Sequence, residues 1–162
     1  MKIGILSDTH DNLNNLEKAV QLFREKGIHT LIHAGDFVSP FVLRAMEGKI
    51  ENLVGVFGNN DGDKLMLRNI SDKAGWSIVK PPHSLTLADK RFLIMHEPDI
   101  LEIALQSGLY DTIIYGHTHK IDIIREKQTL VINPGEAGGW LSGEGSAVIL
   151  DTDTMKEELF TF

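Results

Sequence analysis

The 162-residue sequence contains no cysteine. Without thiols the chain has neither disulfides nor thiolate metal ligands, so any metal must be held by His, Asp, Glu or Asn side chains. Such nitrogen and oxygen ligands suit manganese, magnesium, iron, nickel or zinc. The missing residue type therefore narrows the kinds of metal site that the chain can build.

Basic residues and long apolar runs are also scarce. The chain has 16 Lys and Arg against 23 Asp and Glu, a formal net charge of -7, so we expect no stable nucleic-acid binding through a basic surface. A phosphate ligand is still compatible, because bound cations would reverse the local sign of the charge. No apolar run approaches the roughly 20 residues of a membrane span, and Ile3–Leu6 is too short for a signal-peptide core. We expect a cytoplasmic protein without a membrane partner.

No linker, charge block or internal repeat divides the sequence, so we expect a single domain over residues 1–162. Apolar runs and helical periodicity predict βα units in the first half and β-hairpins later, which is an α/β protein. The predicted strands are 3–6, 30–34, 52–57, 85–88, 91–95, 111–115, 121–125, 128–132, 147–150 and 158–162. The predicted helices cover about 13–26, 40–47, 64–74 and 99–105.

Two histidines follow the apolar run Ile113–Tyr115, in the segment Gly116-His117-Thr118-His119. Alternate side chains of an extended segment point the same way, so His117 and His119 can converge on one ligand. Taken alone, the segment could equally be a polar loop that contains two histidines.

Four other predicted strands end in the same kind of residue. The carboxyl ends of strands in open α/β sheets are where ligands bind. Each residue has an ordinary alternative, such as a turn, a helix cap or a core histidine, but the joint pattern favours one shared site. With His117 and His119 the candidate ligands are Asp8, His10, Asp36, Asn59 and His96.

Seven ligands are too many for one zinc ion and suit two metals that share a carboxylate. Asp36 is the natural bridge, because its carboxylate has two oxygens and it follows the middle one of the three early strands. The sequence thus predicts a paired-metal site.

The order of these motifs resembles that of calcineurin-like metallophosphoesterases. They run Asp-x-His, Gly-Asp, Gly-Asn-x-Asp, a lone histidine after a strand, and Gly-His-x-His. The chain length, the Gly-His-Thr-His segment and the following Asn133-Pro134-Gly135 are similar to the small bacterial and archaeal YfcE-type phosphodiesterases.

The resemblance implies a four-layer αββα sandwich, in which helices flank two mixed sheets. It also implies two divalent metal ions, manganese first, with nickel, iron, zinc or magnesium as alternatives. One metal would be held by Asp8, His10, Asp36 and His119. The other would be held by Asp36, Asn59, His96 and His117.

The activity implied is that of a hydrolase acting on a small phosphodiester, with phosphomonoesterase activity as a near variant. Two metals about 3.5–4 Å apart can bridge a hydroxide and neutralise phosphate charge during in-line displacement. The catalytic residues are then Asp36, as bridge, and Asn60, beside the phosphate. One competing hypothesis is a catalytically weak or inactive scaffold similar to Vps29, and another is an amidase. Homo-oligomerisation stays open.

Three positions depart from the family pattern. Asn60 stands where many relatives have a histidine that helps the leaving group; because Asn cannot supply a proton, we expect slow turnover or a bias toward good leaving groups. Glu97 replaces a glycine, and we expect it to point to solvent. Glu136 replaces the serine usual after Asn-Pro-Gly, which puts a hydroxyl contact there in doubt.

Three further residues have two interpretations or a local role. His33 either hydrogen-bonds toward the metal site or packs inside its strand. Trp140 either anchors its glycine-rich loop, which we favour, or stacks on a substrate base or fills an oligomer contact. Asp61 is expected to orient its own loop.

Overall fold

The computed structural model describes residues 1–162, and its elements follow the predicted order. The first half contains β1 (Lys2–Leu6), α1 (Leu13–Glu25), β2 (Thr30–His33), α2 (Pro40–Met46), β3 (Asn52–Val56), α3 (Lys64–Lys73) and β4 (Ser77–Val79). The second half contains β5 (His83–Leu87), β6 (Lys90–Ile94), α4 (Leu101–Ser107), β7 (Thr112–Ile114), β8 (Ile121–Glu126), β9 (Thr129–Pro134), β10 (Ser146–Asp151) and β11 (Lys156–Thr161). Only β4 is absent from the prediction, because three residues between Trp76 and Lys80 carry too little pattern.

The strands form two mixed sheets. The first has the order β11-β10-β1-β2-β3-β4, and the second has the order β5-β6-β7-β9-β8. Strands β1 to β4 pair in parallel, and β10 and β11 extend that sheet as antiparallel strands. In the second sheet β6, β7 and β9 are parallel, while β5 and β8 are antiparallel edges.

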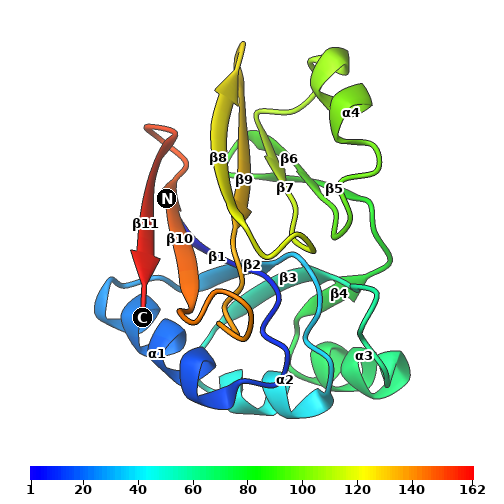
Figure 1. Ribbon diagram of the computed structural model, residues 1–162, viewed down its shortest axis with the longest axis vertical. Helices are drawn as coiled ribbons and strands as arrows, with labels where there is room; N and C mark the ends of the chain where they lie inside the picture. Colours follow the sequence, from blue (N-terminus) through cyan, green and yellow to red (C-terminus); the bar gives the residue numbers. More distant parts are fainter.

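Three buried clusters hold four layers together. The largest joins α1, α2 and α3 to the first sheet and includes Phe23, Leu43 and Leu67. The second lies between the sheets and includes Ile5 and Ile114, and the third packs Ala104 of α4 on the outer face of the second sheet. Figure 1 shows α1 to α3 beneath one sheet and α4 beyond the other. The αββα sandwich expected from the resemblance is therefore confirmed.

The early helices begin where the sequence offers a cap. Asn12 Oδ1 accepts the N–H of Asn15 at the start of α1, and Ser39 precedes Pro40 at the first position of α2. The side chain of Asp63 accepts the N–H of Met66 in α3. Such caps satisfy N–H groups that have no partner within the helix, so they favour a helix start at these positions.

Backbone contacts bring the carboxyl ends of strands from both sheets to one edge. The N–H of Asp8, after β1, donates to the carbonyl of Gly35, after β2, at 3.0 Å. The N–H of Gly116, after β7, donates to the carbonyl of His96, after β6, also at 3.0 Å. His96 Nδ1 then lies 2.8 Å from the carbonyl oxygen of Ala34 and ties the two sheets together. The loops that carry the candidate ligands therefore face one another.

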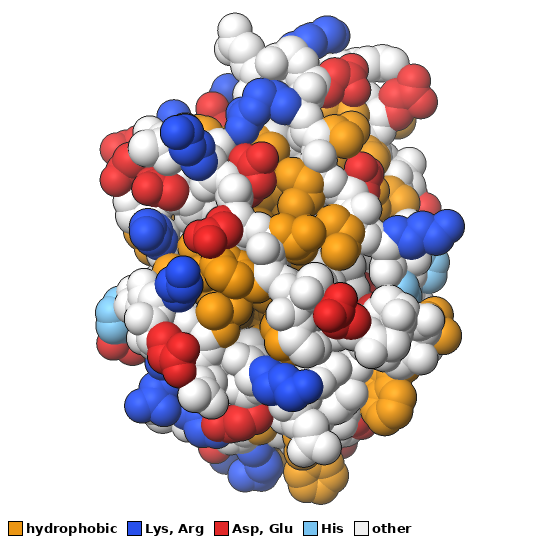
Figure 2. Space-filling model, turned by 60° about the vertical axis from the view of Figure 1, so that its left-hand side comes forward, with side chains coloured by type: hydrophobic (Ala, Val, Ile, Leu, Met, Phe, Trp, Pro, Cys, Tyr) orange, Lys and Arg blue, Asp and Glu red, His pale blue; other side chains and the backbone are white.

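Apolar surface is distributed unevenly outside this edge. Figure 2 shows hydrophobic side chains gathered on the side where β8 and β11 lie, and these strands expose Ile121, Ile124 and Leu159. No helix in the structure combines the length and the apolar character that a transmembrane segment requires.

Candidate metal centre

Two carboxylates, Asp8 and Asp36, lie fully buried at the shared edge of the sheets. No lysine or arginine forms an ion pair with either of them, and their ion-pair partners are the histidines His10, His96 and His119. Burying a carboxylate is costly unless a charge or a metal compensates it. Two such groups inside a ring of imidazoles therefore form an electrostatic arrangement that favours bound cations.

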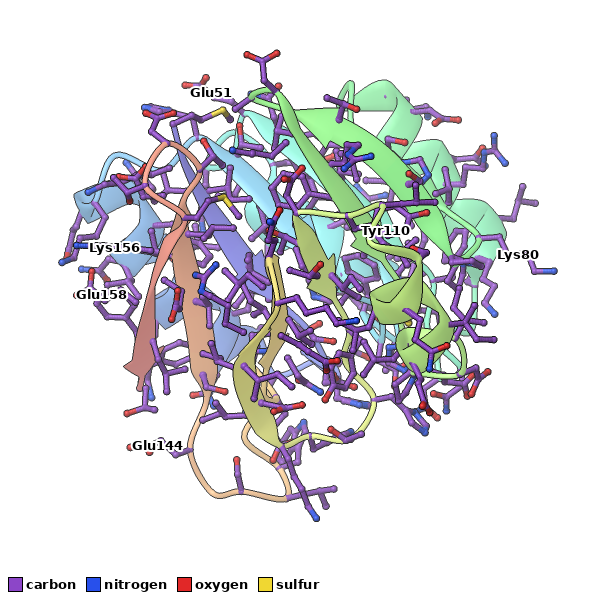
Figure 3. The ribbon with its side chains drawn as sticks, turned by 90° about the horizontal axis from the view of Figure 1, so that it is seen from above. Glu51, Lys80, Tyr110, Glu144, Lys156 and Glu158 are labelled. Carbon is purple, nitrogen blue, oxygen red and sulfur yellow. The ribbon has the colours of Figure 1, made fainter.

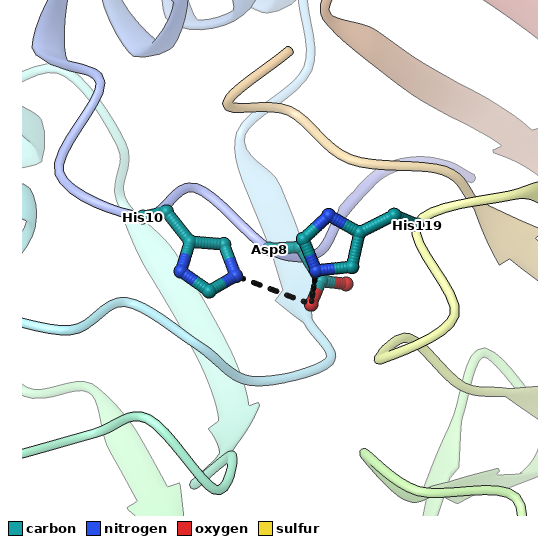
Figure 4. A group of neighbouring side chains, drawn as sticks. All are labelled: Asp8, His10 and His119. Carbon is teal, nitrogen blue, oxygen red and sulfur yellow. Dashed lines mark ion pairs between the residues drawn. The ribbon is translucent and has the colours of Figure 1, made fainter. Parts of the chain in front are cut away.

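Asp8, His10 and His119 make the first group of candidate ligands (Figure 4). Asp8 Oδ1 lies 3.7 Å from His10 Nε2 and 3.5 Å from His119 Nε2. These distances exceed hydrogen-bond length, and neither Asp8 Oδ1 nor His10 Nε2 has a hydrogen-bond partner although both are buried. Buried polar atoms are almost always paired, so these two atoms are candidates for holding a ligand.

Asp36 connects this group to a second one around His96. Asp36 Oδ2 lies 3.3 Å from both His10 Nε2 and His96 Nε2. Asn59 Oδ1 lies 2.9 Å from His96 Nε2 and 3.0 Å from His117 Nδ1. The seven residues picked out by the sequence pattern therefore meet at one place, with Asp36 between the two histidine groups.

The protonation of His96 is set by its surroundings. Its Nδ1–H donates to the carbonyl of Ala34 at 2.8 Å, which leaves Nε2 facing the oxygens of Asp36 and Asn59. Burial lowers the pKa of His96, but the nearby Asp36 carboxylate outweighs burial and raises it. For Asp36 burial raises the pKa, whereas hydrogen bonds from His96 and Asn60 outweigh burial and lower it. The two side chains thus stabilise each other's charged forms.

The backbone of the ligand loops is strained in a way that the sequence does not reveal. Asp8, His10, Asp36, His117 and His119 all have positive φ between 42° and 66°. Non-glycine residues seldom adopt this conformation, which occurs preferentially at functional sites. The close packing needs glycine nearby, because a Cβ at Gly58 would lie 2.1 Å from Asp36 Oδ1.

Asn60 lies directly against the shared carboxylate. Its backbone N–H donates to Asp36 Oδ1 and its Nδ2 donates to Asp36 Oδ2, each at 2.8 Å. The residue is exposed. Its backbone and side chain therefore hold both oxygens of Asp36 in place from the solvent side.

Glu136 is the site residue whose role the sequence reasoning missed. It is 1% exposed, and its Oε2 lies 2.9 Å from His119 Nδ1. The backbone N–H groups of Trp140, Leu141 and Ser142 also donate to its carboxylate. Burial raises the pKa of Glu136, but the hydrogen bonds from Ser142 and His119 outweigh burial and lower it. The only signal in the sequence is a charged residue among the small residues after Asn-Pro-Gly.

The carboxylate of Glu136 fixes the orientation of His119. With its Nδ1–H donated to Glu136, the ring turns Nε2 toward Asp8. A carboxylate behind a metal-binding histidine sets the tautomer in this way and raises the basicity of the other ring nitrogen.

Asp61 and Glu97 lie near the centre without being candidate ligands. Asp61 accepts the N–H groups of Gly58 and Val38 at 2.7 Å, so its expected role in orienting its loop is confirmed. Glu97 is exposed, as expected.

His33 is buried and stacks on Phe37, with ring centroids 3.8 Å apart, and burial lowers its pKa to about 3. The packed interpretation of His33 is confirmed, although its Nε2 also lies 3.3 Å from Thr9 Oγ1.

Comparisons with known proteins agree with this geometry. Residues 1–155 match the calcineurin-like phosphoesterase superfamily domain. The chain is 44% identical to phosphodiesterase MJ0936 of Methanocaldococcus jannaschii over 156 residues, which cover 94% of each chain. It superposes on the structure of an archaeal phosphodiesterase with a TM-score of 0.93, at 41% identity and with all of both chains covered.

A third similarity extends to the fold alone. The structure of vacuolar protein sorting 29 from Cryptosporidium parvum aligns with a TM-score of 0.70 at 17% identity, covering 99% of this chain and 96% of that one. The family match, the 44% identical relative and the candidate ligand groups for divalent metal ions lead to one conclusion: this chain belongs to the calcineurin-like phosphoesterase superfamily.

Proposed function

We propose that the protein is a metal-dependent phosphodiesterase whose site holds two divalent metal ions. Asp8, His10, Asp36 and His119 would hold one ion, and Asp36, Asn59, His96 and His117 the other. The relative MJ0936 is named a phosphodiesterase, which supports the substrate class. Manganese is our first choice of metal from the family resemblance, and carboxylate, amide and imidazole ligands are compatible with it.

The observation that carries this proposal is the pair of unsatisfied buried atoms, Asp8 Oδ1 and His10 Nε2. Each unpaired buried group costs about 1–3 kcal/mol, and one shared metal ion would satisfy both atoms. Here the ligand atoms of Asp8, His10 and His119 lie within 4.8 Å of one another, as do those of Asp8, Asp36 and His96. Their spacing suits atoms that share an ion.

Bound divalent ions would lower the pKa of water and neutralise the negative charge on the phosphate. The protein residues orient the groups around that chemistry. Asn60 fixes both oxygens of Asp36, Glu136 fixes the ring of His119, and the Ala34 carbonyl fixes the ring of His96. With such ions bound no serine, cysteine or threonine nucleophile is required, and water would supply the group that attacks the phosphorus.

A cavity of about 360 Å³ adjoins the site and gives room for a small substrate. Asn59 and His96 form the wall that it shares with the candidate centre, and Lys64, Lys80 and Glu97 supply charged groups around it. Figure 3 shows the side chain of Lys80 extending into solvent. The volume lies at the lower end of the range for ligand sites, roughly 300–1,000 Å³, which favours a small phosphodiester as substrate.

The test is hydrolysis of bis-(p-nitrophenyl) phosphate after chelation and re-addition of single metals. We expect chelation to abolish hydrolysis and manganese to restore it most fully among manganese, nickel, iron, zinc and magnesium. Full activity in the presence of chelator would overturn the metal requirement. Hydrolysis of p-nitrophenyl acetate and of a p-nitroanilide, measured in parallel, should be negligible.

Two alternatives are separated by the same experiment. An amidase or carboxylesterase would hydrolyse the anilide or the acetate and leave the phosphodiester intact. A scaffold comparable to Vps29 would hydrolyse none of these substrates, with or without bound metal. The complete set of candidate ligands favours the enzyme over the scaffold.

Asn60→His should increase the hydrolysis of diesters with poor leaving groups. Histidine can donate a proton where asparagine can only donate a hydrogen bond, and general-acid help is worth about 10²–10⁴-fold when well aligned. We expect a rise of about tenfold for an alkyl leaving group, since the alignment is not optimised, and little change for p-nitrophenolate. Equal effects on both leaving groups would contradict a proton-donating role at this position.

A further inference from the structure

The loop between β9 and β10 presents an exposed aromatic side chain beside the candidate metal centre. Trp140 is 63% exposed and the next residue, Leu141, is 78% exposed. Figure 3 shows this loop, with Glu144 labelled, extending from the body of the molecule. The segment Gly138–Gly143 carries no charge, so the loop offers an apolar surface at the rim of a strongly polar site.

Trp140 is held rigidly although it is exposed. Its indole Nε1–H donates to the carbonyl of His10 at 3.0 Å. Its backbone N–H donates to Glu136 Oε2 at 3.1 Å. The start of the loop is fixed as well, because Asn12 and Asn15 both donate to the carbonyl of Gly138, at 2.7 and 3.0 Å. The indole is therefore ordered before any ligand arrives, which lowers the entropy cost of binding to it.

The contact with His10 sets the position of the indole relative to the chemistry. His10 is a candidate ligand, and its ring centroid lies 5.0 Å from that of His119. A group bound at this centre would therefore lie close to the indole. The cavity described above adjoins Asn59 and His96 instead, so the two ligand groups of the centre have different neighbours.

We propose that Trp140, with Leu141, is a binding subsite for an aromatic substituent of the substrate, and that Glu136 positions this subsite. The inference rests on the proposed phosphodiesterase function and narrows its substrate class to phosphodiesters that carry an aromatic group, such as a nucleobase or an aryl ring. Glu136 takes part because one carboxylate fixes both the ring of His119 and the backbone of Trp140.

Two phosphonates that cannot be hydrolysed provide the test. Phenylphosphonate and methylphosphonate share the metal-binding group and differ in the aromatic ring. Calorimetry on the manganese-loaded protein should show phenylphosphonate binding about tenfold more tightly, in line with the cost of removing an aromatic stacking partner. Trp140→Ala should abolish this preference, Trp140→Phe should keep most of it, and Ile103→Ala, an exposed apolar residue of α4, should leave it unchanged.

Tryptophan fluorescence gives a second readout, because the only other tryptophan, Trp76, is buried. Phenylphosphonate should change the emission of the wild-type protein and not that of Trp140→Phe. Equal binding of both phosphonates by a protein that hydrolyses bis-(p-nitrophenyl) phosphate would overturn the subsite and leave the proposed function intact. Failure to bind either phosphonate, together with no hydrolysis, would overturn the function itself.

The same variants separate a substrate subsite from a contact between copies of the chain. If Trp140→Ala changes the sedimentation coefficient and leaves the phosphonate preference intact, the indole belongs to an oligomer interface and the subsite proposal is wrong. A shared loss of preference and fluorescence response, with unchanged sedimentation, would support it.

Discussion

Asp36→Asn should lower phosphodiester hydrolysis by more than about 100-fold. Loss of a residue that only supports a metal ligand costs about 10–100-fold, and Asp36 is itself a proposed ligand. The proposed centre shares this carboxylate between both metal ions, so the substitution removes the negative charge that both ions share and one of the two oxygen ligands. Asparagine has nearly the same shape, which limits disruption of the buried loop. Calorimetric titration with manganese should show that at least one binding event is lost.

The matched control for this substitution is Asp72→Asn. Asp72 is an exposed carboxylate on α3 that pairs with Arg68 at 3.9 Å, and it is not one of the candidate metal ligands. Circular dichroism should show that both variants fold. If Asp36→Asn retains wild-type manganese affinity and activity, the proposed bridging role is wrong.

Glu136→Gln should weaken manganese binding by about 10–100-fold, the range observed when a carboxylate behind a metal-binding histidine is removed. Glutamine replaces one oxygen by an NH₂ group, which cannot accept the hydrogen bonds that His119 Nδ1 and the N–H of Trp140 now donate to Oε2. The ring of His119 loses its fixed orientation. Manganese titration followed by calorimetry measures the effect without relying on activity.

Trp140→Phe separates the two roles of Glu136. It removes the indole hydrogen bond to His10 and keeps the backbone N–H that Glu136 accepts. We expect manganese affinity close to wild type for Trp140→Phe and a clear loss for Glu136→Gln. Similar losses in both variants would mean that loop order, and not the contact with His119, controls metal binding.

Much of the fold follows from local pattern. Runs such as Ile3–Leu6 and Ile113–Tyr115 mark buried strands, and Asn12 and Pro40 mark helix starts. The motif residues could be grouped because parallel strands bring their carboxyl ends to one edge. The division of the strands into two sheets was predictable only through the resemblance, because no local sequence signal indicates that β6 and β7 belong to a second sheet. The three-residue edge strand β4 left no periodicity to detect.

The finer features of the site depend on tertiary contacts. The positive φ of Asp8 and Asp36 arises from loops packed between two sheets, which one-dimensional spacing does not encode. Glu136 looked like a departure from a serine motif, because nothing in the sequence says that three backbone N–H groups turn back onto its carboxylate. Burial of a charged residue such as Glu136 cannot be predicted from sequence until its hydrogen-bond partners are known.

The meeting of strand ends at one edge also affects how the chain unfolds. The contact between the N–H of His117 and Asp8 Oδ2 joins residues 109 positions apart. Ions held between such distant loops would act as cross-links of the folded state in a chain that has no disulfides, and would stabilise that state because they bind it and not the unfolded chain. Such a cross-link forms only in the folded state and is worth about 2.7 kcal/mol when the free ion is at 100 times its dissociation constant. Unlike a covalent bridge, it is removed by a chelator and insensitive to a thiol reductant.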